Sequence, residues 1–199
     1  MTTTLPVMTT SNTWHRDRGL ARWAFASTSR SAHASEGLIA HVVAVASCVA
    51  PFADIASVSW STGAKGEDSL VRSFESVPSE AAIIEGAGAL DDITGATLEL
   101  DLRCISSDGA LRRVEDGASL EIERTSDGTV VTTFVLNVDL FVPLTWGTVR
   151  QNGELASTNA PRLNAFLERL SAASGGVLSY FDTDEYTGQL TEIGVAGAV

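Results

Sequence analysis

Cysteine is scarce in this chain: its 199 residues include two, Cys48 and Cys104. Two thiols cannot build the disulfide framework that holds small secreted scaffolds together. Each falls on the apolar side of the element expected around it, where a thiol behaves as a small hydrophobic group. We therefore expect both to be buried, free thiols in a protein that works in a reducing compartment.

Long apolar segments are also lacking. The longest run, residues 38–55, is interrupted by His41, Pro51 and Asp54, which argues against a membrane span. Residues 1–12 contain neither Lys nor Arg and no apolar stretch of the length that a secretory signal needs. We expect a cytoplasmic protein, with export by a route that leaves no amino-terminal signal as the alternative.

Basic residues are outnumbered by acidic ones, 13 against 25, for a formal net charge of −12. Residues 36–199 hold nine bases against 24 acids, a net −15. Nucleic-acid binding needs Lys and Arg to neutralise phosphates, so this balance argues against it, and against binding to an anionic membrane surface. A basic protein partner fits the charge, as does an acidic surface that only keeps the protein in solution.

Catalytic and nucleotide-binding motifs are absent from the sequence. It contains no Gly-x-Ser-x-Gly elbow, no phosphate loop and no Gly-x-Gly-x-x-Gly fingerprint. The three histidines, His15, His33 and His41, do not stand at metal-ligand spacing. A nucleophilic pair of His41 and Cys48 would lack the charged surroundings that activate a thiolate. We expect no catalytic residue, no metal and no cofactor.

Length and composition are those of one domain. With 44% hydrophobic residues the chain can bury a core without disulfides or a metal. Residues 1–13 are rich in Thr, which indicates a flexible lead-in. The expected organisation is this lead-in followed by a single α+β domain, residues 14–199.

Residues 98–142 alternate between apolar and polar side chains and contain three Asp-Gly steps, at 108–109, 116–117 and 127–128. Asp-Gly between alternating runs is typical of the turn in a β-hairpin. The segment therefore predicts an antiparallel meander of three or four strands.

A three-residue loop at 126–128 fixes the register of the last hairpin, because it sets Thr125 opposite Thr129 and hence Leu120 opposite Phe134. Period-two alternation then gives an inner face of Leu120, Ile122, Val130, Phe134, Leu136, Val138, Leu140 and Val142. The other face carries Glu121, Glu123, Asn137 and Asp139. Like charges across a ladder are mildly destabilising, and a cation or a basic partner would relieve them.

The rest of the chain supplies helices and further strands. Residues 20–28 and 56–60 alternate as strands, residues 35–50 have helical apolar spacing, and residues 70–93 are irregular with a loop near Gly86 and Gly88.

A last helix is expected after a cap at Thr158 or Asn159, with Pro161 in its first turn. Gly175 and Gly176 end it, and a strand at 177–181 follows. The predicted fold is α+β: an antiparallel twisted sheet of about six strands, with two main helices packed on one face.

Candidate binding residues are acidic or aromatic. Asp182, Asp184 and Glu185 form the densest late acidic cluster, and Tyr186 beside them is of the type that anchors interfaces. A calcium site there lacks the glycine and terminal glutamate of an EF-hand loop, and an ordinary solvated edge is the plain alternative. The further candidates are Glu121, Glu123 and Asp139 on the polar strand face, and Trp146 in a loop after Pro143.

We expect an acidic protein-binding module, an inhibitor or immunity protein that neutralises a basic toxin or enzyme. In size, acidity and lack of catalytic motifs the chain is similar to single-domain immunity proteins of bacterial toxin systems. One alternative is a carboxylate-dependent hydrolase or isomerase that uses Asp139 with Glu121 or Glu123. Another is a structural subunit whose Thr-rich amino terminus packs on a neighbouring copy.

Overall fold

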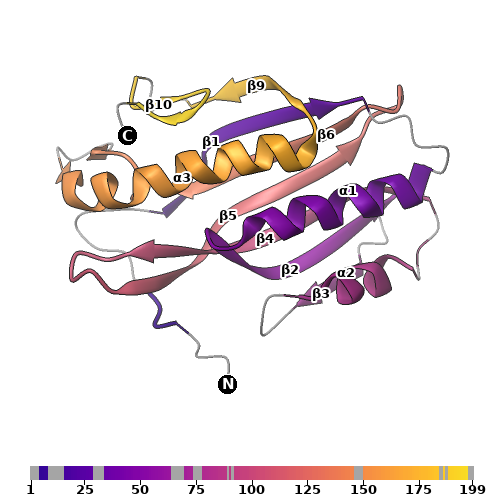
Figure 1. Cartoon of the computed structure of the whole chain (residues 1–199), viewed down its shortest axis with the longest axis horizontal. Helices are drawn as coiled ribbons and strands as arrows, with labels where there is room; N and C mark the ends of the chain where they lie inside the picture. Colours follow the sequence, from indigo (N-terminus) through magenta and orange to yellow (C-terminus); the bar gives the residue numbers. More distant parts are fainter. Residues whose placement is uncertain are drawn as a thin grey trace.

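Seven strands form one antiparallel sheet in the order β3-β2-β4-β5-β6-β1-β9 (Figure 1). The computed structural model describes residues 5–8, 16–28, 34–63, 70–73, 78–88, 90, 92–145, 150–183, 186 and 188–196. The strands of the sheet are β1 (Arg16–Ser27), β2 (Ala53–Thr62), β3 (Leu70–Ser73), β4 (Ile93–Ile105), β5 (Leu111–Arg124), β6 (Val130–Val138) and β9 (Val177–Asp182). Two small hairpins complete the strands: β7 (Leu144–Thr145) with β8 (Arg150–Gln151), and β10 (Leu190–Thr191) with β11 (Gly194–Val195).

Two long helices lie side by side across one face of the sheet, α1 (Ala34–Val49) and α3 (Gly153–Ser174) (Figure 1). The short α2 (Glu80–Ala87) contacts α1 near the β3 edge. The α+β class and the packing of two main helices on one face are thereby confirmed. Among the described residues, no helix has both the length and the apolar character needed to cross a membrane.

The core fills the space between the helices and the sheet. Phe166 of α3 stacks on Phe52 with ring centroids 4.4 Å apart and meets Phe134 of β6 edge-on at 5.0 Å. The predicted inner face is correct, since all eight of its residues are at most 5% exposed. The predicted register is also confirmed, with Leu120 opposite Phe134 and the Thr125 amide donating to the Thr129 carbonyl at 2.8 Å.

The Asp-Gly step at 116–117 lies inside β5 and is not a turn. Three residues, 115–117, stand opposite the single Asp101 of β4, so β5 bulges there. Asp116 has φ +49° and Gly117 approaches Leu102 too closely for a side chain. The steps at 108–109 and 127–128 do turn the chain, with Gly109 and Gly128 at positive φ. A bulge and a turn share the same dipeptide signal, because both place a residue in the left-handed region.

The start of the last helix was predicted too late. α3 begins at Gly153 with Asn152 as its N-cap, which leaves Pro161 inside the helix. Leu155 is 7% exposed, and the completely buried Asn159 bonds both the amide and the carbonyl of Ile105 at 2.8 Å. These contacts with β4 hold the first two turns in place and outweigh the hydrogen bond that Pro161 cannot make.

The segment around residue 86 differs from the expected arrangement, and part of the predicted lead-in contacts the sheet. The glycine-marked loop near residue 86 contains α2, capped by the Ser79 side chain, which accepts a hydrogen bond from the Ala82 amide. Residues 5–8, within the predicted lead-in, bridge to β5: the Arg113 amide donates to the Pro6 carbonyl, and the Met8 amide to the Arg113 carbonyl.

Candidate functional site

The sheet face opposite α1 and α3, here called the open face, carries no described helix. Alternation along each strand sends to this face the residues that lie between the buried apolar ones. One row of directly paired residues crosses five strands: Glu99 of β4, Ser119 of β5, Val135 of β6, Arg22 of β1 and Asp182 of β9. Cross-strand partners point to the same side of a sheet, so this row forms a continuous strip of the open face.

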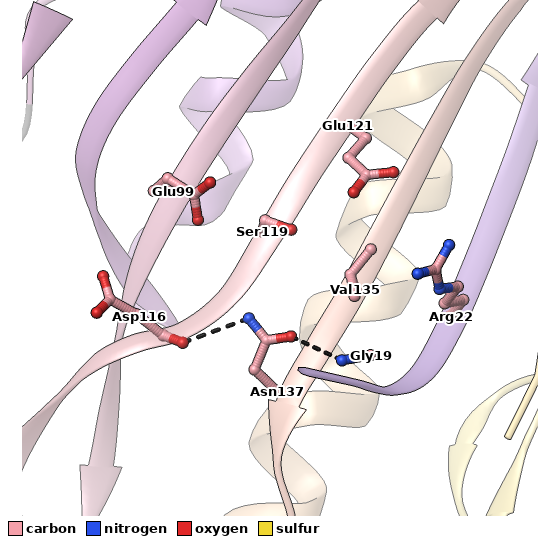
Figure 2. A pocket seen from close by; sticks show the side chains of 8 residues that line it. All are labelled: Gly19, Arg22, Glu99, Asp116, Ser119, Glu121, Val135 and Asn137. Carbon is pink, nitrogen blue, oxygen red and sulfur yellow. Dashed lines mark hydrogen bonds between the residues drawn. The ribbon is translucent and has the colours of Figure 1, made fainter. Parts of the chain in front are cut away.

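A depression of about 450 Å³ is centred on this strip (Figure 2). Glu121 adds a second carboxylate two residues along β5 from Ser119. Ser119 and Val135 are 7% and 4% exposed and form the floor. The depression is lined by Gly19, Arg22, Glu99, Asp116, Ser119, Glu121, Val135 and Asn137.

Two bulges at one end of the depression curve the sheet. In β1, residues 17–20 stand opposite the single residue Asn137 of β6, and the β5 bulge at 115–117 flanks Asn137 from the other side. The Asn137 side chain ties the two together: its Oδ1 accepts from the Gly19 amide at 3.0 Å and its Nδ2 donates to the Asp116 carbonyl at 3.3 Å (Figure 2). Bulges increase local twist and re-aim side chains, which gives this face its concavity.

Asp101 holds the β5 bulge from the neighbouring strand. Its Oδ1 accepts a hydrogen bond from the Asp116 amide at 3.0 Å, and its Oδ2 lies 3.4 Å from Nη1 of Arg113. Burial raises the pKa of this carboxyl group above its ordinary value, and the amide and Arg113 oppose that shift only in part. Asp101 is thus a buried support for the bulge, and it does not line the depression.

Charge on the open face is unbalanced. Arg103 is paired with Asp54, its Nε donating to Oδ2 at 2.9 Å, and Arg113 is paired with Asp101 and with Glu115 at 2.7 Å. Among the residues whose side chains the structure describes, Arg22 is the one cation that lines the depression. The described carboxylates on the same face are Glu99, Asp116, Glu121, Glu123 and Asp182. Among the described side chains, negative charges therefore outnumber positive ones around the depression.

Three of the predicted binding residues lie on this face. Glu121 lines the depression, Glu123 is exposed farther along β5, and Asp182 stands directly opposite Arg22 at the β9 edge. The sheet pairing thus places Glu121 of β5 and Asp182 of β9, three strands apart, on the same face. Asp184, Glu185 and Trp146 lie outside the described residues.

Asp139 and Tyr186 are not on the open face, contrary to the predicted placement of Asp139. They are 2% and 3% exposed, and the Tyr186 hydroxyl group lies 3.3 Å from Oδ2 of Asp139. β6 ends at Val138, so alternation no longer applies at Asp139, whose carbonyl accepts from Nδ2 of Asn152 at the start of α3. The hydrolase or isomerase hypothesis needed Asp139 in one pocket with Glu121 or Glu123, but Asp139 is buried while Glu121 and Glu123 lie on the open face.

Cys48, Cys104 and His41 are packed within the fold. Cys104 is buried and Cys48 half-buried, both are free, and burial raises their pKa values to about 12 and about 11. Nε2 of His41 lies 2.7 Å from Oγ1 of the buried Thr132, and burial lowers the pKa of the imidazole. Within the described ranges no three His, Cys, Asp or Glu residues are grouped as a metal site.

Seven of the eight residues that line the depression were not among the predicted binding residues: Gly19, Arg22, Glu99, Asp116, Ser119, Val135 and Asn137. Glu99 and Asn137 did fall on outward positions of their strands, and that parity is the one signal that could have selected them. Ser119 and Arg22 become neighbours of these residues only through the pairing of β4, β5, β6 and β1.

Comparisons of the chain with protein-family models, with curated proteins and with solved structures find no match.

Proposed function

We propose that this chain is an acidic protein-binding module that recognises a basic protein through the open face. The observation that carries the proposal is the charge imbalance there. The cations Arg103 and Arg113 are already paired within the chain, whereas Glu121 and Glu123 project from β5 with no ion-pair partner in the described part of the chain. Complementary charge accelerates encounter and rejects wrong partners.

The size of the face supports an interface. Seven strands at about 4.8 Å spacing and roughly six residues of about 3.3 Å along each give an area of about 600 Å². Counting both partners, that corresponds to roughly 1,200 Å², which is at the lower end of specific protein–protein interfaces. The proposed partner is therefore a folded domain or a structured basic segment.

We further propose that binding neutralises the partner, as an inhibitor or a bacterial immunity protein does, and that this takes place in the cytoplasm. The free thiols of Cys48 and Cys104 support a reducing compartment. A module that acts by covering its partner needs a shaped, charged surface, and the open face has that character.

The test compares two double variants that change net charge equally. Glu121→Lys with Glu123→Lys alters the open face, whereas Glu154→Lys with Glu168→Lys alters exposed positions of α3 on the other side. Immobilised wild-type protein is used to capture partners from a lysate of the source cells at low and high salt. Carbodiimide coupling of carboxylates to partner amines, followed by peptide mapping, then locates the contact.

The open-face variant should associate with the captured partner about 10-fold or more slowly at low salt, with a flatter salt dependence. The α3 variant should change the rate much less, because its charges are screened from the interface. Coupling should map to Glu121 or Glu123, and wild-type protein should suppress the partner's activity. Equal loss of binding in both variants, or coupling confined to α3, would contradict the proposal.

A further inference from the structure

On the basis of this proposed function, we infer that the depression over Ser119 is the anchor site for one arginine side chain of the partner. The inference deepens the proposal from a charged face to a particular chemical group. It depends on a cavity, on a hydroxyl group at its floor that no described residue bonds, and on the placement of two carboxylates around that group.

Ser119 is the unusual group of this site. It is 7% exposed and lines the depression, yet its hydroxyl group has no hydrogen-bond partner among the described residues. Its oxygen is open to the depression and is not one of the fully buried unsatisfied atoms of the described chain, so it can accept a hydrogen bond from a ligand that reaches the floor. Its neighbour Val135 offers an apolar contact at the same depth. A ligand that reaches the floor should therefore carry both an aliphatic stem and a hydrogen-bond donor.

The carboxylates are placed for a cation with more than one donor. Glu99 is the direct cross-strand partner of Ser119, and Glu121 follows two residues along β5, so the two flank the hydroxyl group from different sides (Figure 2). Diagonal neighbours of this kind have Cα atoms roughly 7–8 Å apart. A guanidinium group has five N–H donors in a planar fork, enough to bond both carboxylates and Ser119 together. The ammonium group of lysine is a point charge and matches this spacing less well.

Arg22 places a positive charge at the side of the depression, two strands away from Ser119. It lies about 10 Å from Ser119 at normal strand spacing, and directly opposite Asp182. This backbone separation is about one Debye length in physiological salt, which weakens the repulsion between Arg22 and a bound guanidinium. Arg22 also allows the sign of the ligand's charge to be tested, because removing its positive charge should strengthen the binding of a cation and weaken the binding of an anion.

The experiment titrates ¹⁵N-labelled protein with L-arginine amide, with L-lysine amide as the comparison probe. We expect saturable amide shifts at Ser119, Glu121 and Asn137, with lysine amide at least about 5-fold weaker. Glu121→Gln and Ser119→Ala should each weaken arginine amide by about 5- to 10-fold. Glu168→Gln on α3 is the matched control and should leave the affinity unchanged, and Arg22→Gln should leave it equal or higher. Amide spectra of each variant away from the site report whether the fold is retained.

Shifts spread equally over all carboxylate-bearing surfaces, or an unchanged affinity in Glu121→Gln and Ser119→Ala, would overturn the inference. Weaker binding in Arg22→Gln would also overturn it, since that result indicates an anionic ligand. These outcomes are separable from failure of the proposed function. A partner that binds through Glu123 while arginine amide leaves Ser119 unmoved refutes the anchor alone. Specific arginine binding without any captured protein refutes the protein-binding function alone.

Discussion

Gly117 offers a quantitative test of the bulge that shapes the depression. A Cβ atom at this position would lie 2.7 Å from both Cγ and Cδ1 of Leu102 and 3.2 Å from the Val114 carbonyl oxygen. Leu102 is completely buried, so it cannot swing away into solvent. Gly117→Ala therefore forces the bulge and its neighbour apart by several tenths of an ångström or more.

The magnitude follows from two opposing effects. Forcing an extra methyl group into a packed site costs about 1–3 kcal/mol. Alanine also restricts the unfolded chain, which offsets roughly 0.4–1 kcal/mol of that cost. The net loss of unfolding free energy should be about 0.5–2 kcal/mol. At roughly 2–4 °C per kcal/mol for a chain of this size, the melting temperature should fall by roughly 1–8 °C.

Gly153→Ala is the matched control, because a Cβ atom there would meet nothing within 4 Å and the residue begins α3. It shares the unfolded-state effect with Gly117→Ala and lacks the clash, so it should be neutral or slightly stabilising. The two variants should differ by about 1–3 kcal/mol in urea denaturation. Equal unfolding free energies for both, within about 0.5 kcal/mol, would refute the close approach of Gly117 to Leu102.

Two further predictions concern titratable groups. Burial raises the pKa of Asp101 in the folded protein above the value of about 3.9 that it has in the unfolded chain. Ionising Asp101 therefore lowers the stability of the protein as the pH rises from about 3.9 through the pKa of the folded state. The stability advantage of wild type over Asp101→Asn, measured by urea denaturation, should therefore shrink from pH 4 to pH 7, and an advantage that grows over this range would contradict the desolvation argument. With pKa values raised to about 11 and about 12, Cys48 and Cys104 should react with a thiol reagent at pH 8 on the order of 10²-fold and 10³-fold more slowly than free cysteine, respectively. Both should become fully reactive in urea, and rapid labelling of the native protein would contradict the burial of these thiols.

Local sequence signals were sufficient for the elements that depend on neighbouring residues. The β5–β6 register followed from a three-residue loop and period-two alternation, and the end of α3 followed from Gly175, which adopts φ +58°. Both features are decided within a few residues of the signal itself. The start of α3 was misplaced because Pro161 is a strong local marker, whereas the bonds from Asn159 to Ile105 cross 54 positions of sequence.

The candidate site, in contrast, depends on residues that are far apart in the sequence. Composition and alternation are properties of the residues alone, so an acidic chain with a one-sided antiparallel sheet could be predicted from them. The bulge at Asp116 and Gly117 could not, because the partner that holds it is Asp101 on another strand. The tertiary structure also decided which acids share a surface. Pairing across β4, β5, β6 and β1 sets Glu99 and Arg22 in one row, and strand order is fixed by long-range packing that no local pattern encodes.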